Sequence, residues 1–142
     1  MGSAAVDRAW VVRNRNERPP VTNSTALRIA AISGFLAVGL GAFGAHGLKE
    51  LLTRNGTVTI WEKAVFYQFI HTLMLFILAR RSPLYSGPWF SFLAGIVIFS
   101  GSLYLLAITN FKWFGAITPI GGLSFLVGWL WLVIAPERKD KP

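Results

Sequence analysis

Four long apolar runs occupy most of this chain and restrict it to folds that cross a membrane. The runs are Leu27–His46, Ala64–Ala79, Trp89–Ile108 and Trp113–Ala135. About 18 or more mostly uncharged residues can cross the roughly 30 Å hydrocarbon core as a helix, a length that the second run reaches once Trp61–Lys63 is counted as its first turn. Because lipid offers no hydrogen bonds, each span must satisfy its own backbone groups. We therefore predict an all-α integral membrane four-helix bundle.

The basic residues determine the predicted topology. Ten of the 14 Lys and Arg residues lie in the N-terminal arm up to Arg28, in the loop between the second and third runs, or in the C-terminal tail. The other four lie in the first and third loops. Loops rich in Lys and Arg stay on the cytoplasmic side. Both termini are therefore expected in the cytoplasm, or in the matrix if the membrane is the mitochondrial inner membrane.

Composition excludes several classes of function. The net charge is +8, but the basic residues flank the apolar runs, where they suit topology signals and anionic lipid headgroups. Since no basic face lies on a folded soluble module, we expect no binding of nucleic acid. The chain has no cysteine, which excludes disulfides, iron–sulfur clusters and thiolate metal sites.

The chain divides into three parts. Residues 1–26 form a polar, Arg-rich cytoplasmic arm, residues 27–135 form the membrane domain, and residues 136–142 form a basic cytoplasmic tail. The arm has no apolar core, so it is not a cleaved secretory signal, although a mitochondrial presequence is an open alternative. Such an arm is normally disordered by itself, so a partner is needed to hold it in one place. We hypothesise that the arm lies along the cytoplasmic face of a partner subunit.

Small residues are predicted to line two helix-packing seams. Helices in lipid associate by close van der Waals approach, which small side chains permit. The seam of the first helix and that of the fourth consist of Gly34, Ala37, Gly41, Gly44 and Ala45, and of Gly121, Ser124 and Gly128. We interpret both as internal packing of the bundle, and the alternative is that one seam docks a partner subunit.

Several strings together resemble a known family. In order they are Ala31–Phe35 (AISGF), Leu40–Gly47 (LGAFGAHG), Tyr67-Gln68 with His71, Phe99–Leu106 (FSGSLYLL), and Thr118–Gly122 (TPIGG) with Gly128-Trp129. Over residues 27–135 the chain resembles the small bacterial membrane family called domain of unknown function 423, and it is similar also to the transmembrane protein 256 group. The resemblance implies a compact four-helix protein of the bacterial cytoplasmic (inner) membrane. It transfers no catalytic residue.

A polar intramembrane cluster holds the candidate site residues, which are His46, Glu62, Lys63, Tyr67, Gln68 and His71. Lys63, Tyr67 and His71 follow one another at i, i+4 and i+8, so they form a stripe on the second helix. His46 and Glu62 lie near the same membrane face and are expected to meet. We interpret the cluster as interhelical hydrogen bonding that sets the register of the bundle. A proton path through the histidines is the alternative.

A haem held by both histidines is a further alternative. Its axial ligands need nearly equal depth, but His71 lies about 15 Å deeper than the helix end near His46. Zinc would need a third ligand, which nothing supplies. We expect no metal, no catalytic residue and no cofactor, with haem or pigment contact only through a partner.

The predicted function is that of a non-enzymatic accessory or structural subunit in a larger membrane complex, such as an electron-transfer complex. Its expected partners are membrane lipids and other membrane subunits. A small transporter or proton-conducting bundle and a haem-binding membrane protein are the rival functions.

Overall fold

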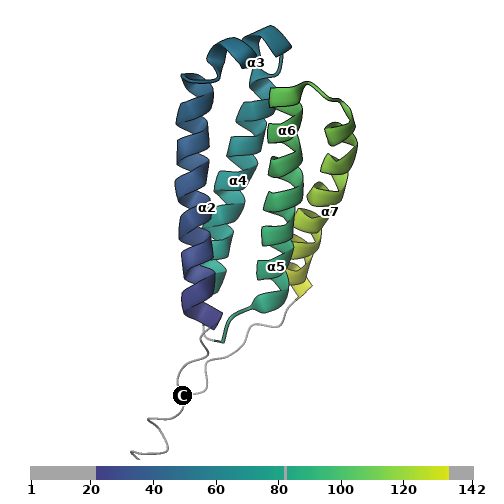
Figure 1. Cartoon of the computed structure of the whole chain (residues 1–142). Helices are drawn as coiled ribbons and strands as arrows, with labels where there is room; N and C mark the ends of the chain where they lie inside the picture. The colour runs from purple at the N-terminus through teal and green to yellow at the C-terminus, as the bar shows by residue number, and fades with distance from the viewer. Residues whose placement is uncertain (1–21, 82, 135–142) are drawn as a thin grey trace, which may run out of the picture.

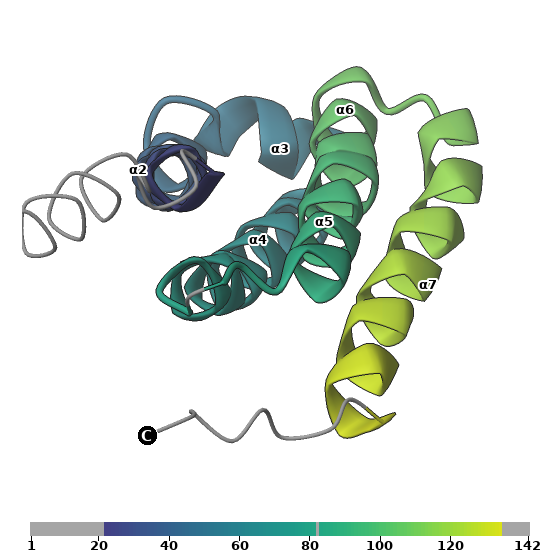
Figure 2. The ribbon, with the colours of Figure 1, turned by 90° about the horizontal axis from the view of Figure 1, so that it is seen from below.

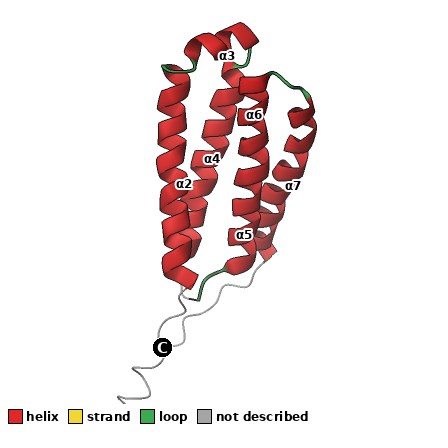
Figure 3. Cartoon of the chain, in the orientation of Figure 1, coloured by secondary structure: helices red, strands yellow, loops and turns green. Residues whose placement is uncertain are grey.

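A computed structural model describes residues 22–81 and 83–134, which are helical apart from short connections (Figures 1 and 3). The helical segments in these ranges are α2 (Thr22–Ala45), α3 (Lys49–Asn55), α4 (Val58–Ala79), α5 (Ser86–Gly95), η1 (Ile96–Ser100), α6 (Gly101–Thr109) and α7 (Trp113–Ile134). Four helices are long and apolar enough to span a membrane, and α5, η1 and α6 together form the third of them. The predicted all-α fold with four spans is confirmed.

Within this bundle the four spans pack as an open row. α2 packs on α4, α4 on the third span, and the third span on α7 (Figure 2). In the described ranges, no Cα atom of α2 lies within 8 Å of one in α5, η1, α6 or α7, and the same holds between α4 and α7. α2 and α7 are therefore the edges of the row.

The short helix α3, which lies across one end of the bundle (Figure 1), was not predicted. It ends at Gly56, whose φ of 66° suits a residue without a Cβ. Asn55 Nδ2 donates to the carbonyls of Ala107 (3.1 Å) and Ile108 (3.0 Å), and Thr57 Oγ1 donates to Ala107 O (2.8 Å). These bonds fasten the connection to the last turn of α6.

A tight turn joins α6 and α7 as an antiparallel hairpin (Figure 1). Asn110 closes α6 at a φ of 55°, and its N–H donates to Leu106 O (2.8 Å). Asn is one of the few residues other than Gly that adopt this left-handed conformation at low cost. The polypeptide can therefore reverse direction between Thr109 and Trp113.

A π-helical segment, η1, interrupts the third span. In a π turn the backbone bonds run from residue i to i+5, so one residue more is accommodated than in an α turn. Val97 faces outward from this segment, whereas Ser100 is buried. Among the described residues the Ser100 hydroxyl has no hydrogen-bond partner.

Two buried apolar clusters hold the row together. The larger one joins all four spans and contains Ala26, Ala30, Leu75, Leu78, Ala79, Trp89, Phe92, Ile96 and Phe125. The smaller one, formed by Leu52, Trp61 and Ala107, lies at the α3 end. Trp61 and Trp89 are both buried in these clusters, and each indole N–H donates to a carbonyl of another span, Trp89 to Leu75 O (3.1 Å) and Trp61 to Leu40 O (3.0 Å).

One predicted boundary needs correction. α2 begins at Thr22, so its first turn includes residues assigned to the polar arm. Asn23 supports this turn, because its Nδ2 donates to Arg81 O (2.9 Å) in the loop beyond α4. The remainder of the predicted arm and the predicted tail lie outside the described residues.

Candidate functional site

Gln68 is the centre of a buried polar network that joins three spans. Its Nε2 donates to Ser33 O on α2 (3.0 Å), and its Oε1 accepts from the Tyr104 hydroxyl on α6 (2.9 Å). One turn farther along α4, the hydroxyls of Ser33 and Thr72 lie 2.6 Å apart. Since an unpaired polar group costs free energy in hydrocarbon, these bonds set the register of α2 and α6 against α4.

His71 is buried between α4 and α7, and both of its ring nitrogens are engaged. Nδ1 lies 2.8 Å from Tyr67 O. A carbonyl oxygen can only accept, so Nδ1 carries the proton. Nε2 accepts from the indole N–H of Trp129 (3.3 Å), and the ring stacks on Phe125 with centroids 3.6 Å apart. The residue is therefore held as one neutral tautomer.

The other predicted members of the polar cluster do not join this interior. His46 lies in the exposed turn after α2, and Glu62 and Lys63 are exposed on the first turns of α4. Within the described ranges His46 and Glu62 share no hydrogen bond or ion pair, so the expectation that they meet is wrong. The Tyr67 side chain is 37% exposed, and it takes part through its backbone carbonyl and its ring. The predicted cluster therefore reduces to Gln68 and His71.

Four residues that bond to Gln68, to His71 or to each other were not predicted from the sequence, namely Ser33, Thr72, Tyr104 and Trp129. Ser33, Tyr104 and Trp129 lie within the strings that carry the family resemblance, which was a usable signal. Nothing local distinguishes Thr72 from any other hydroxyl in a span. Their roles depend on which helix faces meet.

The predicted small-residue seam of α2 lies against α4. Ala37 is buried, and a Cβ at Gly34 or Gly41 would contact Thr72 Cγ2 at 3.5 Å or Val65 Cγ1 at 3.4 Å. The predicted Gly44 is also buried, and a Cβ there would overlap the Trp61 indole. Ala45, the last member of the seam, is instead exposed and lines a groove.

The small residues of the α7 seam allow α7 to approach the third span closely. A Cβ at Gly121 would lie 2.7 Å from the Phe99 Cα, and one at Gly128 would lie 2.8 Å from the Phe92 ring. Ser124 Oγ donates to Ser91 O (3.0 Å). Ser102 Oγ donates to Phe99 O (3.0 Å) and lies 2.9 Å from Thr118 Oγ1 on α7.

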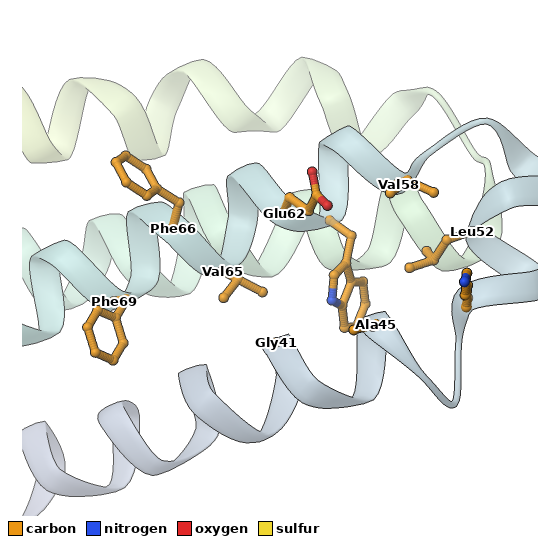
Figure 4. A pocket seen from close by; sticks show the side chains of 11 residues that line it. Gly41, Ala45, Leu52, Val58, Glu62, Val65, Phe66 and Phe69 are labelled. Carbon is orange, nitrogen blue, oxygen red and sulfur yellow. The ribbon is translucent and has the colours of Figure 1, made fainter.

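Two hollows open on the surface that faces lipid. One, of about 610 Å³, lies between α4, η1 and α7 and reaches His71. The other, of about 470 Å³, follows the α2–α4 contact and has Lys49 and Glu62 on its lining (Figure 4). In the described part of the chain, no three His, Cys, Asp or Glu side chains are grouped to hold a metal ion.

Four apolar spans around an internally bonded polar core define a small multi-pass membrane protein that contacts lipid directly. The chain belongs to the family described as "Protein of unknown function (DUF423)", whose profile matches residues 40–122. The family resemblance predicted from the sequence strings is thereby confirmed.

Curated bacterial relatives extend this match. The chain is 49% identical over 112 residues to the UPF0382 membrane protein of Staphylococcus epidermidis, covering 75% of this chain and 90% of the relative. It is 44% identical over 117 residues to the UPF0382 membrane protein YwdK of Bacillus subtilis, covering 78% and 94%. No solved structure matches the chain. These relatives support a multi-pass protein of a bacterial membrane.

Proposed function

We propose that the chain is a non-enzymatic accessory subunit of a larger assembly in the bacterial cytoplasmic membrane. The observation that carries this proposal is the open row, which leaves two edge helices with broad apolar faces. In the most apolar stretch of α2 only 22% of residues are buried, and in that of α7 only 17%, against 39% in each inner span. An edge helix can accept a neighbouring span without any rearrangement of the fold.

The outer face of α2 supports this role further. Ala31, Gly39 and Ala42 are exposed on the side opposite the buried Ala37. A Cβ at Gly39 would meet nothing within 4 Å. Because small side chains let two backbones approach closely in lipid, this face suits a second helix.

The interior gives less support to transport or haem binding. A haem iron would need a free imidazole nitrogen, but both nitrogens of His71 already have partners. A proton path would need groups that can exchange partners along the span. The bonds of Gln68 instead hold three helices together. A structural role accounts for this core with fewer assumptions.

Photo-crosslinking tests the proposal. A diazirine amino acid is placed at position 42, on the outer face of α2, and, as a matched control, at the lipid-facing position 97 of an inner span. In native membranes we expect position 42 to crosslink to another membrane protein and position 97 to lipid only. If position 42 also yields lipid adducts alone, and native mass spectrometry of gently extracted material shows the chain travelling alone, the proposal is wrong.

The proposed orientation places both termini in the cytoplasm. α2 begins and α7 ends at the same end of the bundle (Figure 1), where Arg28, Arg80 and Arg81 also lie. The excess of basic residues on that side supports a cytoplasmic location. Reporters active on only one membrane face, fused to each terminus in turn, test it. Opposite responses from the two fusions would refute the orientation.

A further inference from the structure

The groove along the α2–α4 contact is long, apolar and open to lipid. Gly41 and Ala45 form its α2 side, and Val65, Phe66 and Phe69 form its α4 side (Figure 4). The α4 lining extends from Val58 to Phe69, eleven steps along the helix, which corresponds to about 16 Å at 1.5 Å per residue. This is about half of the roughly 30 Å hydrocarbon core, the depth that one acyl chain occupies.

The floor of the groove is held rigidly. Trp61 is only 3% exposed, and its indole N–H donates to Leu40 O across the helix contact. The absence of a side chain on Gly44 makes room for this indole. A preformed surface binds with a smaller loss of conformational entropy than one that must be ordered first.

Two opposite charges lie at the α3 end of the groove. Lys49 begins α3 and Glu62 lies on the first turns of α4; both are exposed and both line the groove. Within the described residues, neither forms an ion pair with the other or with a third group. One cation and one anion beside an apolar channel match a headgroup that itself carries a phosphate and an ammonium group.

We propose that this groove binds one aminophospholipid of the phosphatidylethanolamine type. Its acyl chain lies along Gly41, Val65 and Phe69. The Lys49 ammonium donates to the phosphate, and the Glu62 carboxylate accepts from the headgroup amine. The headgroup of phosphatidylglycerol offers Glu62 only neutral hydroxyl donors in place of the ammonium group, so it binds more weakly. The inference is independent of the accessory role.

The test uses the purified full chain in nanodiscs with equal amounts of phosphatidylethanolamine and phosphatidylglycerol of identical acyl chains. Native mass spectrometry then counts the lipids that stay bound. We expect phosphatidylethanolamine to be retained about fivefold over phosphatidylglycerol, and Lys49→Gln or Glu62→Gln to lower its retention about threefold to tenfold. Glu50→Gln and Arg54→Gln, exposed on α3 outside the groove, are matched controls and should leave retention unchanged.

A steric variant separates the groove from the headgroup contacts. Ala45→Leu adds bulk from the exposed side and should lower retention of both lipids, with unchanged helix content by circular dichroism. The proposal is overturned if phosphatidylglycerol is retained equally or better, or if the two charge variants behave like their controls. It is equally overturned if a quinone or a polypeptide, rather than phospholipid, accompanies the purified chain.

Discussion

The contact between α7 and η1 provides a sharp test of the packing, because two adjacent glycines differ in what surrounds them. A Cβ at Gly121 would lie 2.7 Å from the Phe99 Cα and closer still to the Phe99 backbone nitrogen. A Cβ at Gly122 would lie 3.7 Å from Phe99 Cδ2, an ordinary contact. Gly121→Ala should therefore destabilise the fold, whereas Gly122→Ala should not.

The expected difference in unfolding free energy between the two variants follows from the contact of the new methyl group with backbone atoms. Ordinary contact begins at 3.4 Å, so the new methyl group must move α7 and η1 apart by roughly 1 Å. Overpacking costs about 1–3 kcal/mol, and the upper end applies because the obstacle is backbone rather than a mobile side chain. The helix-propensity gain from Gly to Ala, about 0.5–1 kcal/mol, is common to both variants and cancels. We expect the two variants to differ by about 2–3 kcal/mol.

The assay is reversible unfolding in mixed micelles of increasing SDS fraction, followed by far-ultraviolet circular dichroism. Gly128→Ala is a useful intermediate, because its Cβ would meet the Phe92 ring, which can turn aside. The expected order of stability is Gly122→Ala, then Gly128→Ala, then Gly121→Ala. Equal midpoints for the Gly121 and Gly122 variants would show that α7 does not approach Phe99 as closely as described.

Three further predictions concern single contacts. Ser33→Ala and Thr72→Val should each lower the free energy of unfolding by about 1 kcal/mol, and the double variant should cost less than the sum by about 0.6 kcal/mol. Strictly additive losses in this double-mutant cycle would exclude a bond between the two hydroxyls. Asn110→Ala should lower the free energy of unfolding by about 1 kcal/mol in the same assay, because position 110 has a positive φ. Asn110→Gly should lower it by less, and the reverse order would contradict the turn geometry. Haem added to the purified protein should give no Soret band of a histidine-bound iron; a band that disappears in His71→Ala would refute the bonding described for that ring.

The four spans could be predicted because lipid imposes the same requirement on each of them. Length and lack of charge are local properties, so the fourth run, Trp113–Ala135, matches α7 (Trp113–Ile134) almost residue for residue. The helix α3 has only seven residues and depends on bonds from Asn55 and Thr57 to a distant carbonyl. No local pattern contains that information.

The polar stripe on α4 was predicted only in part, for a geometric reason. Lys63 and His71 are eight residues apart, and eight residues exceed two turns by about 80° at 3.6 residues per turn. A stripe that follows i, i+4 and i+8 therefore winds around the helix. Lys63 lies on the exposed side and His71 in the interior, while Gln68, which is not part of the stripe, lies at the centre of the network.

The tryptophans show that composition alone does not distinguish an interface residue from a buried one. An indole prefers the membrane interface because it combines an apolar ring with one donor. The same two properties suit a buried site with an available carbonyl, which is where Trp61 and Trp89 lie. The position of a tryptophan along a span determines its depth in the membrane, but its burial inside the protein depends on the neighbouring helix.

The π turn changes which side chains of the third span face each neighbouring helix. One additional residue in η1 advances everything beyond it by about 100° relative to an uninterrupted helix. As a result α5 presents one side to α4 and α7, while α6 presents another and also reaches α3. Removing the outward-facing Val97 would turn η1 into an ordinary α turn and leave both halves facing their neighbours, whereas winding all residues of η1 as an α-helix would turn the packing side of one half toward the acyl chains.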